Sequence, residues 1–79
     1  MFSYTIYNEA NTEKFAVAMH AIEDFLSVKR EKLLEDVDGS LYARYNFHGK
    51  KIELRSDYDV DAVYCDAEID LSELFGDPI

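Results

Sequence analysis

The chain has few of the residues that crosslink a protein or interrupt its secondary structure. Its 79 residues include one cysteine, one proline, three glycines and no tryptophan. A single cysteine, Cys65, excludes an intrachain disulfide and a zinc site built from several thiolates, and it is typical of a reducing compartment. We therefore expect a cytoplasmic protein.

Long apolar runs are also missing. The first seven residues contain no basic segment and no continuous apolar stretch, so they do not resemble a signal peptide, and no window is long enough to span a membrane. The composition, 48% hydrophobic and 14% aromatic, is nevertheless too apolar for a disordered tail. We expect residues 1–79 to form one small domain without a large substrate cavity.

Basic residues are absent from the last part of the chain. Residues 1–56 hold nine acidic and eight basic side chains, whereas residues 57–79 hold eight acidic and none basic. Nearly all of the net charge of −9 therefore falls in the C-terminal segment. Such a field repels nucleic acid and membrane headgroups and speeds the encounter with a basic protein surface.

Apolar residues at every second position predict four strands, at residues 2–7, 41–47, 51–55 and 63–70. The second and third strands are joined by a tight turn in which Gly49 can take a positive φ. After the first strand, Asn11 or Thr12 can cap a helix that we expect to end between Leu34 and Asp36, before a turn at residues 36–40. Its apolar stripe consists of Phe15, Met19, Ile22, Leu26 and Leu33, with Ala18 and Phe25 beside it.

The spacing of Leu71, Leu74 and Phe75 predicts a short final helical turn that folds back on the core, ended by Gly76 and Pro78. The predicted fold is therefore α+β. It is a four-stranded, mainly antiparallel sheet in the order β-α-β-β-β, with one amphipathic helix packed on one face and a short C-terminal helical turn.

One segment partly matches a calcium-binding loop. Asp57, Asp59, Asp61 and Glu68 have the spacing of positions 1, 3, 5 and 12 of an EF-hand. However, Ala62 stands where the sharp turn of that loop needs glycine, and the preceding segment alternates as a strand. A solvated acidic loop is favoured, and a Ca²⁺-binding module stays an alternative.

No arrangement typical of an enzyme is present. His20 falls on the polar face of the predicted helix and His48 in a hairpin turn, while Cys65 alternates inward with Val63 and Ala67. Glycine-rich phosphate loops and Ser-His-Asp spacing are missing. We expect no catalytic activity, no cofactor and no small-molecule substrate.

The acidic C-terminal part is the most informative feature. Asp66, Glu68 and Asp70 alternate outward on the predicted last strand, which would set them about 6.5–7 Å apart, near the spacing of successive phosphates on one nucleic-acid strand. Exposed tyrosines are enriched at protein interfaces, and Tyr7 and Tyr42 fall on polar sides of strands. The predicted partner-binding residues are Asp57, Tyr58, Asp59, Asp61, Tyr64, Asp66, Glu68, Asp70 and Glu73.

In size and charge placement the chain is similar to small phage-encoded inhibitors that mimic DNA, such as anti-restriction and anti-CRISPR proteins. That likeness implies an inhibitor that docks on the basic, nucleic-acid-binding surface of a partner protein, in the host cytosol if the chain is phage-encoded, without binding nucleic acid itself. A toxin-neutralising immunity protein or antitoxin would use the same face against a basic nuclease. A structural subunit of a larger assembly is a further alternative, marked by an exposed apolar patch.

Overall fold

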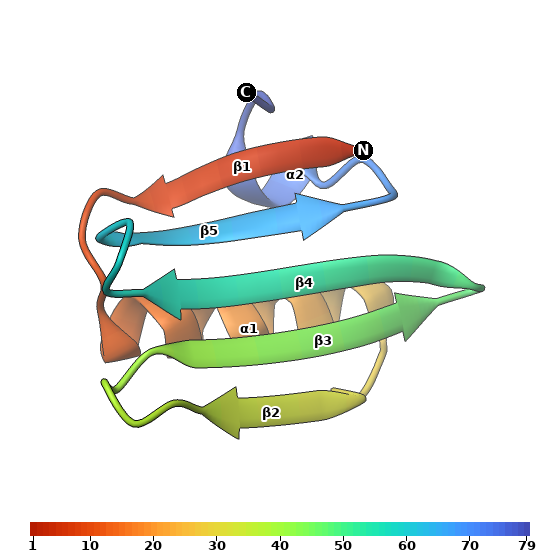
Figure 1. Cartoon of the computed structure of the whole chain (residues 1–79). Helices are drawn as coiled ribbons and strands as arrows, with labels where there is room; N and C mark the ends of the chain where they lie inside the picture. The colour runs from red at the N-terminus through yellow and green to blue at the C-terminus, as the bar shows by residue number, and fades with distance from the viewer.

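The computed structural model describes residues 1–79 as an α+β fold with one sheet, one main helix and one short helix (Figure 1). The elements along the chain are β1 (Phe2–Tyr7), α1 (Thr12–Leu26), β2 (Lys32–Glu35), β3 (Leu41–Phe47), β4 (Lys50–Asp57), β5 (Ala62–Ala67) and α2 (Ser72–Phe75). The predicted fold class is confirmed, but the sheet has five strands where the sequence predicted four. No helix is long and apolar enough to cross a membrane.

The sheet is antiparallel throughout, with strand order β1-β5-β4-β3-β2. The β3–β4 hairpin turns through His48 and Gly49, whose φ values of 52° and 84° match the positive φ that two-residue hairpins require. The N-terminal strand β1 adds to the sheet beside β5, so the first and last strands of the chain are neighbours. The two edges of the sheet are therefore β1 and β2.

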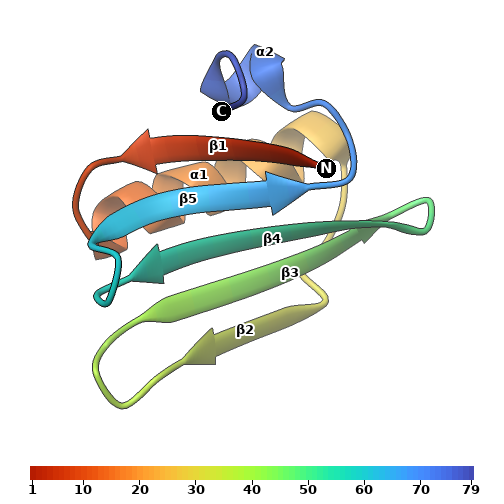
Figure 2. The same ribbon diagram turned by 45° about the horizontal axis from the view of Figure 1, so that its top comes forward.

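Helix α1 covers one face of the sheet and leaves the other open (Figure 2). It begins where the side chain of Asn11 accepts a hydrogen bond from the N–H of Lys14, as the sequence predicted. Its buried residues are Phe15, Ala18, Met19 and Ile22. They meet alternate residues of the strands, including Ala43, Tyr45, Ile52, Leu54, Val63, Cys65 and Ala67.

The predicted length of the helix was wrong. The chain leaves α1 at Ser27, which has φ 54° and ψ 45°, and the N–H groups of Ser27 and Val28 both bond to the carbonyl of Glu23. This left-handed cap turns the chain back toward the sheet. Leu33 lies seven residues after Leu26 and so matches the helical period, but in the structure it belongs to β2.

A buried tyrosine is connected to an ion pair between α1 and the segment that joins α1 to β2. The hydroxyl of Tyr45 donates to Glu23 Oε2 at 2.7 Å, and Arg30 Nε donates to the same oxygen at 2.9 Å. Partial burial of the carboxyl acts to raise the pKa of Glu23, but the hydrogen bonds from Arg30 and Tyr45 together hold it below its ordinary value. Burial raises the pKa of Tyr45, so the phenol stays a donor.

The C-terminal segment folds back on β1. The hydroxyl of Tyr4 accepts from the N–H of Leu71 at 2.7 Å and lies 3.3 Å from Asp70 Oδ1. The rings of Tyr4 and Phe75 lie 5.8 Å apart between centroids, and the side chain of Leu71 is fully buried. The predicted terminal turn that packs on the core is therefore confirmed.

The cap at Ser27 predicts a stability gain on substitution by glycine. The left-handed conformation costs an L-residue about 1–2 kcal/mol, and the greater freedom of glycine in the unfolded chain offsets about 0.5–1 kcal/mol of that gain. Ser27→Gly should therefore raise the free energy of unfolding by about 0.5–1 kcal/mol in urea denaturation. Ser27→Ala is the matched control and should give no gain. Equal effects of the two substitutions would contradict a left-handed cap.

The lowered pKa of Glu23 predicts a pH-dependent contribution to stability. Glu23→Gln should lower the free energy of unfolding at neutral pH by about 1 kcal/mol, because charge-assisted hydrogen bonds are replaced by neutral ones. The ionised form contributes fully above the ordinary pKa of 4.5, and its contribution is lost as the pH falls through the lower folded-state value. The difference between the two proteins, measured by denaturation across pH, should therefore shrink below pH 4.5. A difference that stays constant with pH would rule out this role.

Candidate functional site

Three connections lie at the same end of the sheet: the β1–α1 loop, the β2–β3 turn and the β4–β5 turn (Figure 1). They come together because β1, β2 and β4 all run toward this end of the antiparallel sheet. Residues 35–41 contain three acidic side chains and no basic one, and residues 57–62 contain three more and again no basic one. We call these six carboxylates the acidic end; they are Glu35, Asp36, Asp38, Asp57, Asp59 and Asp61.

The two acidic turns are in direct contact. The N–H of Tyr58 donates to the hydroxyl of Ser40 at 3.0 Å, which joins the β4–β5 turn to the β2–β3 turn. Gly39 has φ 88°, and a Cβ built there would lie only 3.3 Å from the ring of Tyr58. Glycine therefore supplies both the turn conformation and the room for this contact.

The β1–α1 loop is tied to the same place. The N–H of Ala10 donates to Asp61 Oδ1 at 3.0 Å, and the N–H of Asn11 donates to the buried hydroxyl of Ser56 at 2.9 Å. The acidic end is thus held by hydrogen bonds between connections that are far apart in the sequence. The turns that carry its carboxylates therefore have fixed places in the fold.

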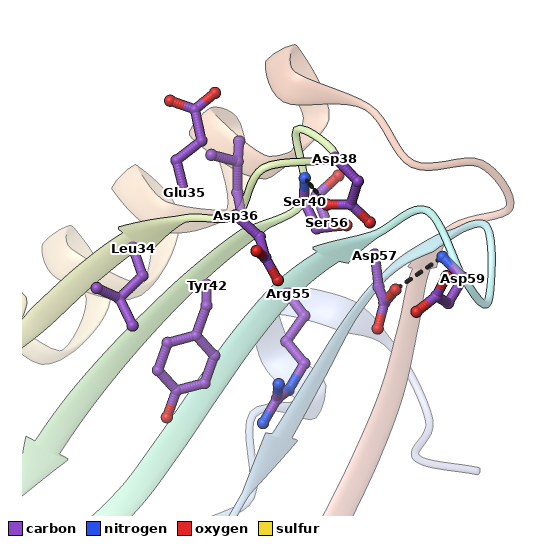
Figure 3. Close-up of a pocket in the computed structure, with 11 residues that line it drawn as sticks. Leu34, Glu35, Asp36, Asp38, Ser40, Tyr42, Arg55, Ser56, Asp57 and Asp59 are labelled. Atoms are coloured by element: carbon purple, nitrogen blue, oxygen red, sulfur yellow. Dashed lines mark hydrogen bonds between the residues drawn. The ribbon is translucent and has the colours of Figure 1, made fainter.

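A depression of about 530 Å³ lies between the two acidic turns (Figure 3). Five of the six acidic residues line it, all except Asp61, and among them Glu35 points its carboxylate away from Tyr42 and Arg55 (Figure 3). Local turn geometry explains part of this clustering, because Asp38 Oδ1 accepts from the N–H of Ser40 and Asp57 Oδ1 accepts from the N–H of Asp59. The bonds from Ser40 hold the pKa of Asp38 below its ordinary value, so this carboxylate stays charged.

None of the six carboxylates takes part in an ion pair. The ion pairs of the structure join Glu23 to His20 and Arg30, Glu31 to Arg44, and Glu53 to Arg55. Arg55 is the one cation that lines the depression, and it is engaged there, since it stacks 4.6 Å from the ring centroid of Tyr42 and lies 3.6 Å from Glu53. The negative charge at the acidic end is therefore left uncompensated.

The regular row predicted on the last strand is present only in part. Strand β5 ends at Ala67, so Asp66 is the only member within it, where it accepts from the hydroxyl of Ser3 at 2.6 Å. Glu68 accepts from the N–H of Lys51, and Asp70 accepts from the N–H of Ser72. Bonds from Ser72 hold the pKa of Asp70 below its ordinary value. The strand therefore does not set the three carboxylates at equal intervals.

The other predicted binding residues lie in different places. Tyr58 is half exposed at the acidic end, against Gly39. Tyr64 is on the open face of the sheet, with its hydroxyl 3.4 Å from Asp57 Oδ2, and burial raises its pKa. Glu73 is exposed on α2, near the opposite end of the sheet. The structure therefore gathers Asp57, Tyr58, Asp59, Asp61 and Tyr64 at the acidic end and leaves Asp66, Glu68, Asp70 and Glu73 apart from it.

The four residues with the spacing of a calcium-binding loop do not come together in the structure. Asp57, Asp59 and Asp61 precede β5, while Glu68 follows it, and a strand of this length spans about 20 Å. No group of three or more His, Cys, Asp or Glu side chains is placed to hold a metal ion. The spacing that resembled an EF-hand comes from the β4–β5 turn followed by β5, which places the three aspartates and Glu68 at opposite ends of that strand.

Sequence reasoning missed Glu35, Asp36 and Asp38. The turn at residues 36–40 was recognised, but the predicted helix ended immediately before it, so nothing placed the turn beside residues 57–61. The sequence does contain a signal for this arrangement, namely two Asp-rich turns separated by the length of two strands. Two paired antiparallel strands return the chain to the same end of a sheet, so the two turns would be expected to lie side by side.

The residues considered for catalysis lie apart from one another. Cys65 is fully buried, and that burial raises the pKa of its thiol to about 12. His20 is exposed on α1, 4.0 Å from Glu23. His48 lies in the β3–β4 turn, where its ring and that of Phe47 are arranged edge to face. No nucleophile is paired with a base in these positions.

Neither a known protein family, nor a curated protein, nor a solved structure matches the chain. The case for a function therefore rests on the geometry of the molecule.

Repulsion between carboxylates at the acidic end predicts that neutralising two of them stabilises the fold. Glu35→Gln with Asp59→Asn should raise the free energy of unfolding by a few tenths of a kcal/mol, more at low salt than at high salt, because like charges are removed without loss of a side-chain hydrogen bond. Glu73→Gln with Asp77→Asn changes the net charge equally and is the matched control. The free energies of unfolding of the variant and of the control are measured by denaturation at two salt concentrations. An equal increase in the control would show that only the net charge matters.

Proposed function

We propose that the protein is a binding protein that docks its acidic end on the basic, nucleic-acid-binding surface of a partner protein and thereby blocks that surface. The observation that carries the proposal is the group of six carboxylates from two touching turns, none of which is in an ion pair. A globular protein gains nothing in stability from such a cluster, because like charges repel.

The geometry supports binding to a broad cationic surface. Four of the carboxylates, those of Asp36, Asp38, Asp57 and Asp61, accept hydrogen bonds from backbone N–H groups, so these side chains lose little entropy when a partner binds. Tyr58 is half exposed among them and can supply apolar contact area. The depression between the two acidic turns is open and lined mainly by polar side chains. Such a lining suits lysine and arginine side chains better than a small apolar ligand.

A nucleic-acid-binding partner is favoured over other basic proteins. Surfaces with many lysines and arginines and few acids are the ones that bind phosphate backbones. The acidic end imitates such a backbone through its charge density. This mimicry does not require the evenly spaced row of carboxylates that the sequence suggested. The surface suits both an inhibitor of the anti-restriction or anti-CRISPR type and a toxin-neutralising immunity protein.

The proposal predicts that capture of a partner depends on the acidic end. The variant Asp57→Asn, Asp59→Asn, Asp61→Asn removes three charges and keeps an oxygen that can accept the turn hydrogen bonds. At low salt, the immobilised wild-type chain should retain a nucleic-acid-binding protein from nuclease-treated lysate and release it to added DNA or RNA. The variant should retain at least tenfold less, since several charge contacts contribute together.

The matched control is Asp66→Asn, Glu68→Gln, Asp70→Asn, which removes the same number of charges from the other predicted residues. It should bind nearly as well as the wild type. If both variants lose binding equally, net charge rather than the acidic end is responsible. If the captured protein is not displaced by nucleic acid, the mimicry is wrong. The identity of the captured protein distinguishes an inhibitor of phage defence from an immunity protein.

A further inference from the structure

Strand β2 forms an uncovered edge of the sheet. All four of its residues are exposed, including Leu33 at 46% and Leu34 at 50%. The opposite edge is treated differently, because the N–H of Ile79 donates to the carbonyl of Ser3 and so lies over β1. An edge strand with exposed leucines can pair with another strand.

The β2–β3 ladder shows which backbone groups of β2 are free. Leu34 pairs with Tyr42 in this register, and the N–H of Asp36 donates to the carbonyl of Ser40. Hydrogen-bonded pairs alternate along an antiparallel ladder, so Lys32, Leu34 and Asp36 direct their backbone groups toward β3. The N–H and C=O of Leu33 and Glu35 therefore point outward from the edge.

We propose that β2 pairs antiparallel with β2 of a second copy of this chain, which joins two sheets into one across a twofold axis. A twofold rotation axis perpendicular to the sheet relates two edge strands in antiparallel orientation. Side chains on the open face of one sheet then lie on the open face of the other. With the axis at Leu34, the outward backbone groups of Leu33 meet those of Glu35 in the other copy. Two symmetry-related pairs form, and each exchanges two hydrogen bonds.

On the open face of the sheet the side chains in this register are complementary. Leu34 meets its own copy at the axis on the open face of the sheet, and Lys32 lies opposite Asp36 of the other copy. Both pairs are of the non-hydrogen-bonded kind, in which side chains approach most closely, with Cβ atoms about 4.5–5.5 Å apart. The alternative register, with the axis at Leu33, would set Glu31 opposite Glu35 and is disfavoured.

The charges beyond the strand favour the same pairing. The segment that leads into β2 holds three cations, Lys29, Arg30 and Lys32, and one acid, Glu31. Three acids and no cation end or follow the strand; they are Glu35, Asp36 and Asp38. The twofold brings the basic start of one strand beside the acidic end of the other, and it directs the two acidic ends away from each other. A copy of this chain therefore fits the edge better than a strand of unrelated charge pattern.

Charge reversal tests the pairing by sedimentation velocity over a range of concentrations. Lys32→Asp and Asp36→Lys should each raise the dissociation constant of the dimer about tenfold, or about 1.4 kcal/mol, because two attractive pairs become repulsive. The double variant Lys32→Asp, Asp36→Lys restores attraction and should return the constant to near the wild-type value. Asp36→Lys makes the chain less acidic, so weaker association of that variant cannot result from net repulsion.

Leu33→Pro is a second test that acts on the backbone. Proline removes an outward N–H and leaves the β2–β3 hydrogen bonds in place, so the monomer should keep its circular dichroism spectrum while the dimer is lost. A wild-type chain that stays monomeric at every concentration overturns the proposal. So does a dimer that Leu33→Pro leaves intact, or a double variant that associates no better than the single ones.

Discussion

A single fifteen-residue helix has to cover a sheet of five strands, and the arrangement of the rest of the molecule follows from this constraint. Helix α1 packs mainly against β4, β3 and β1, and its inner residues together with alternate strand residues form the core. The short helix α2 covers the region beside β1 through Tyr4, Leu71 and Phe75. Nothing is left to cover β2, whose four residues are all exposed, or the open face of the sheet (Figure 2). The surfaces available for binding are therefore set by the reach of one helix.

The antiparallel order of the strands has a second consequence, which concerns charge. Hairpin connections return the chain to the same end of the sheet, so acidic turns that are separated in sequence become neighbours. The contact of Tyr58 with Gly39 and Ser40 then fixes the two turns against each other. The three arginines are engaged with Glu23, Glu31 and Glu53 and do not neutralise them. An uncompensated acidic surface results from topology together with the placement of the arginines.

Much of the fold could be predicted from the sequence, because periodicity reports directly on burial. The strands at residues 2–7 and 41–47, the cap at Asn11 and the packing of the terminal turn follow from local patterns and agree with the structure. The fifth strand could not be found in this way, since Leu33 and Leu34 continue the spacing of the helix and no glycine or proline marks Ser27. The acidic residues at 57–61 were identified, whereas their neighbours at 35–38 were missed because strand order is a property of the whole chain. The row at residues 66–70 was predicted from an alternation that extends past the end of β5.

The acidic end should be the strongest cation-binding surface of the molecule, and its affinity for cations can be measured without knowledge of a partner. A short oligolysine peptide titrated into the isotopically labelled chain, followed by two-dimensional amide NMR, reports where the cation binds. We predict that the amides of residues 35–40 and 57–61 shift first and with one common affinity. Larger shifts at residues 66–73, or equal shifts over all acidic segments, would contradict the account.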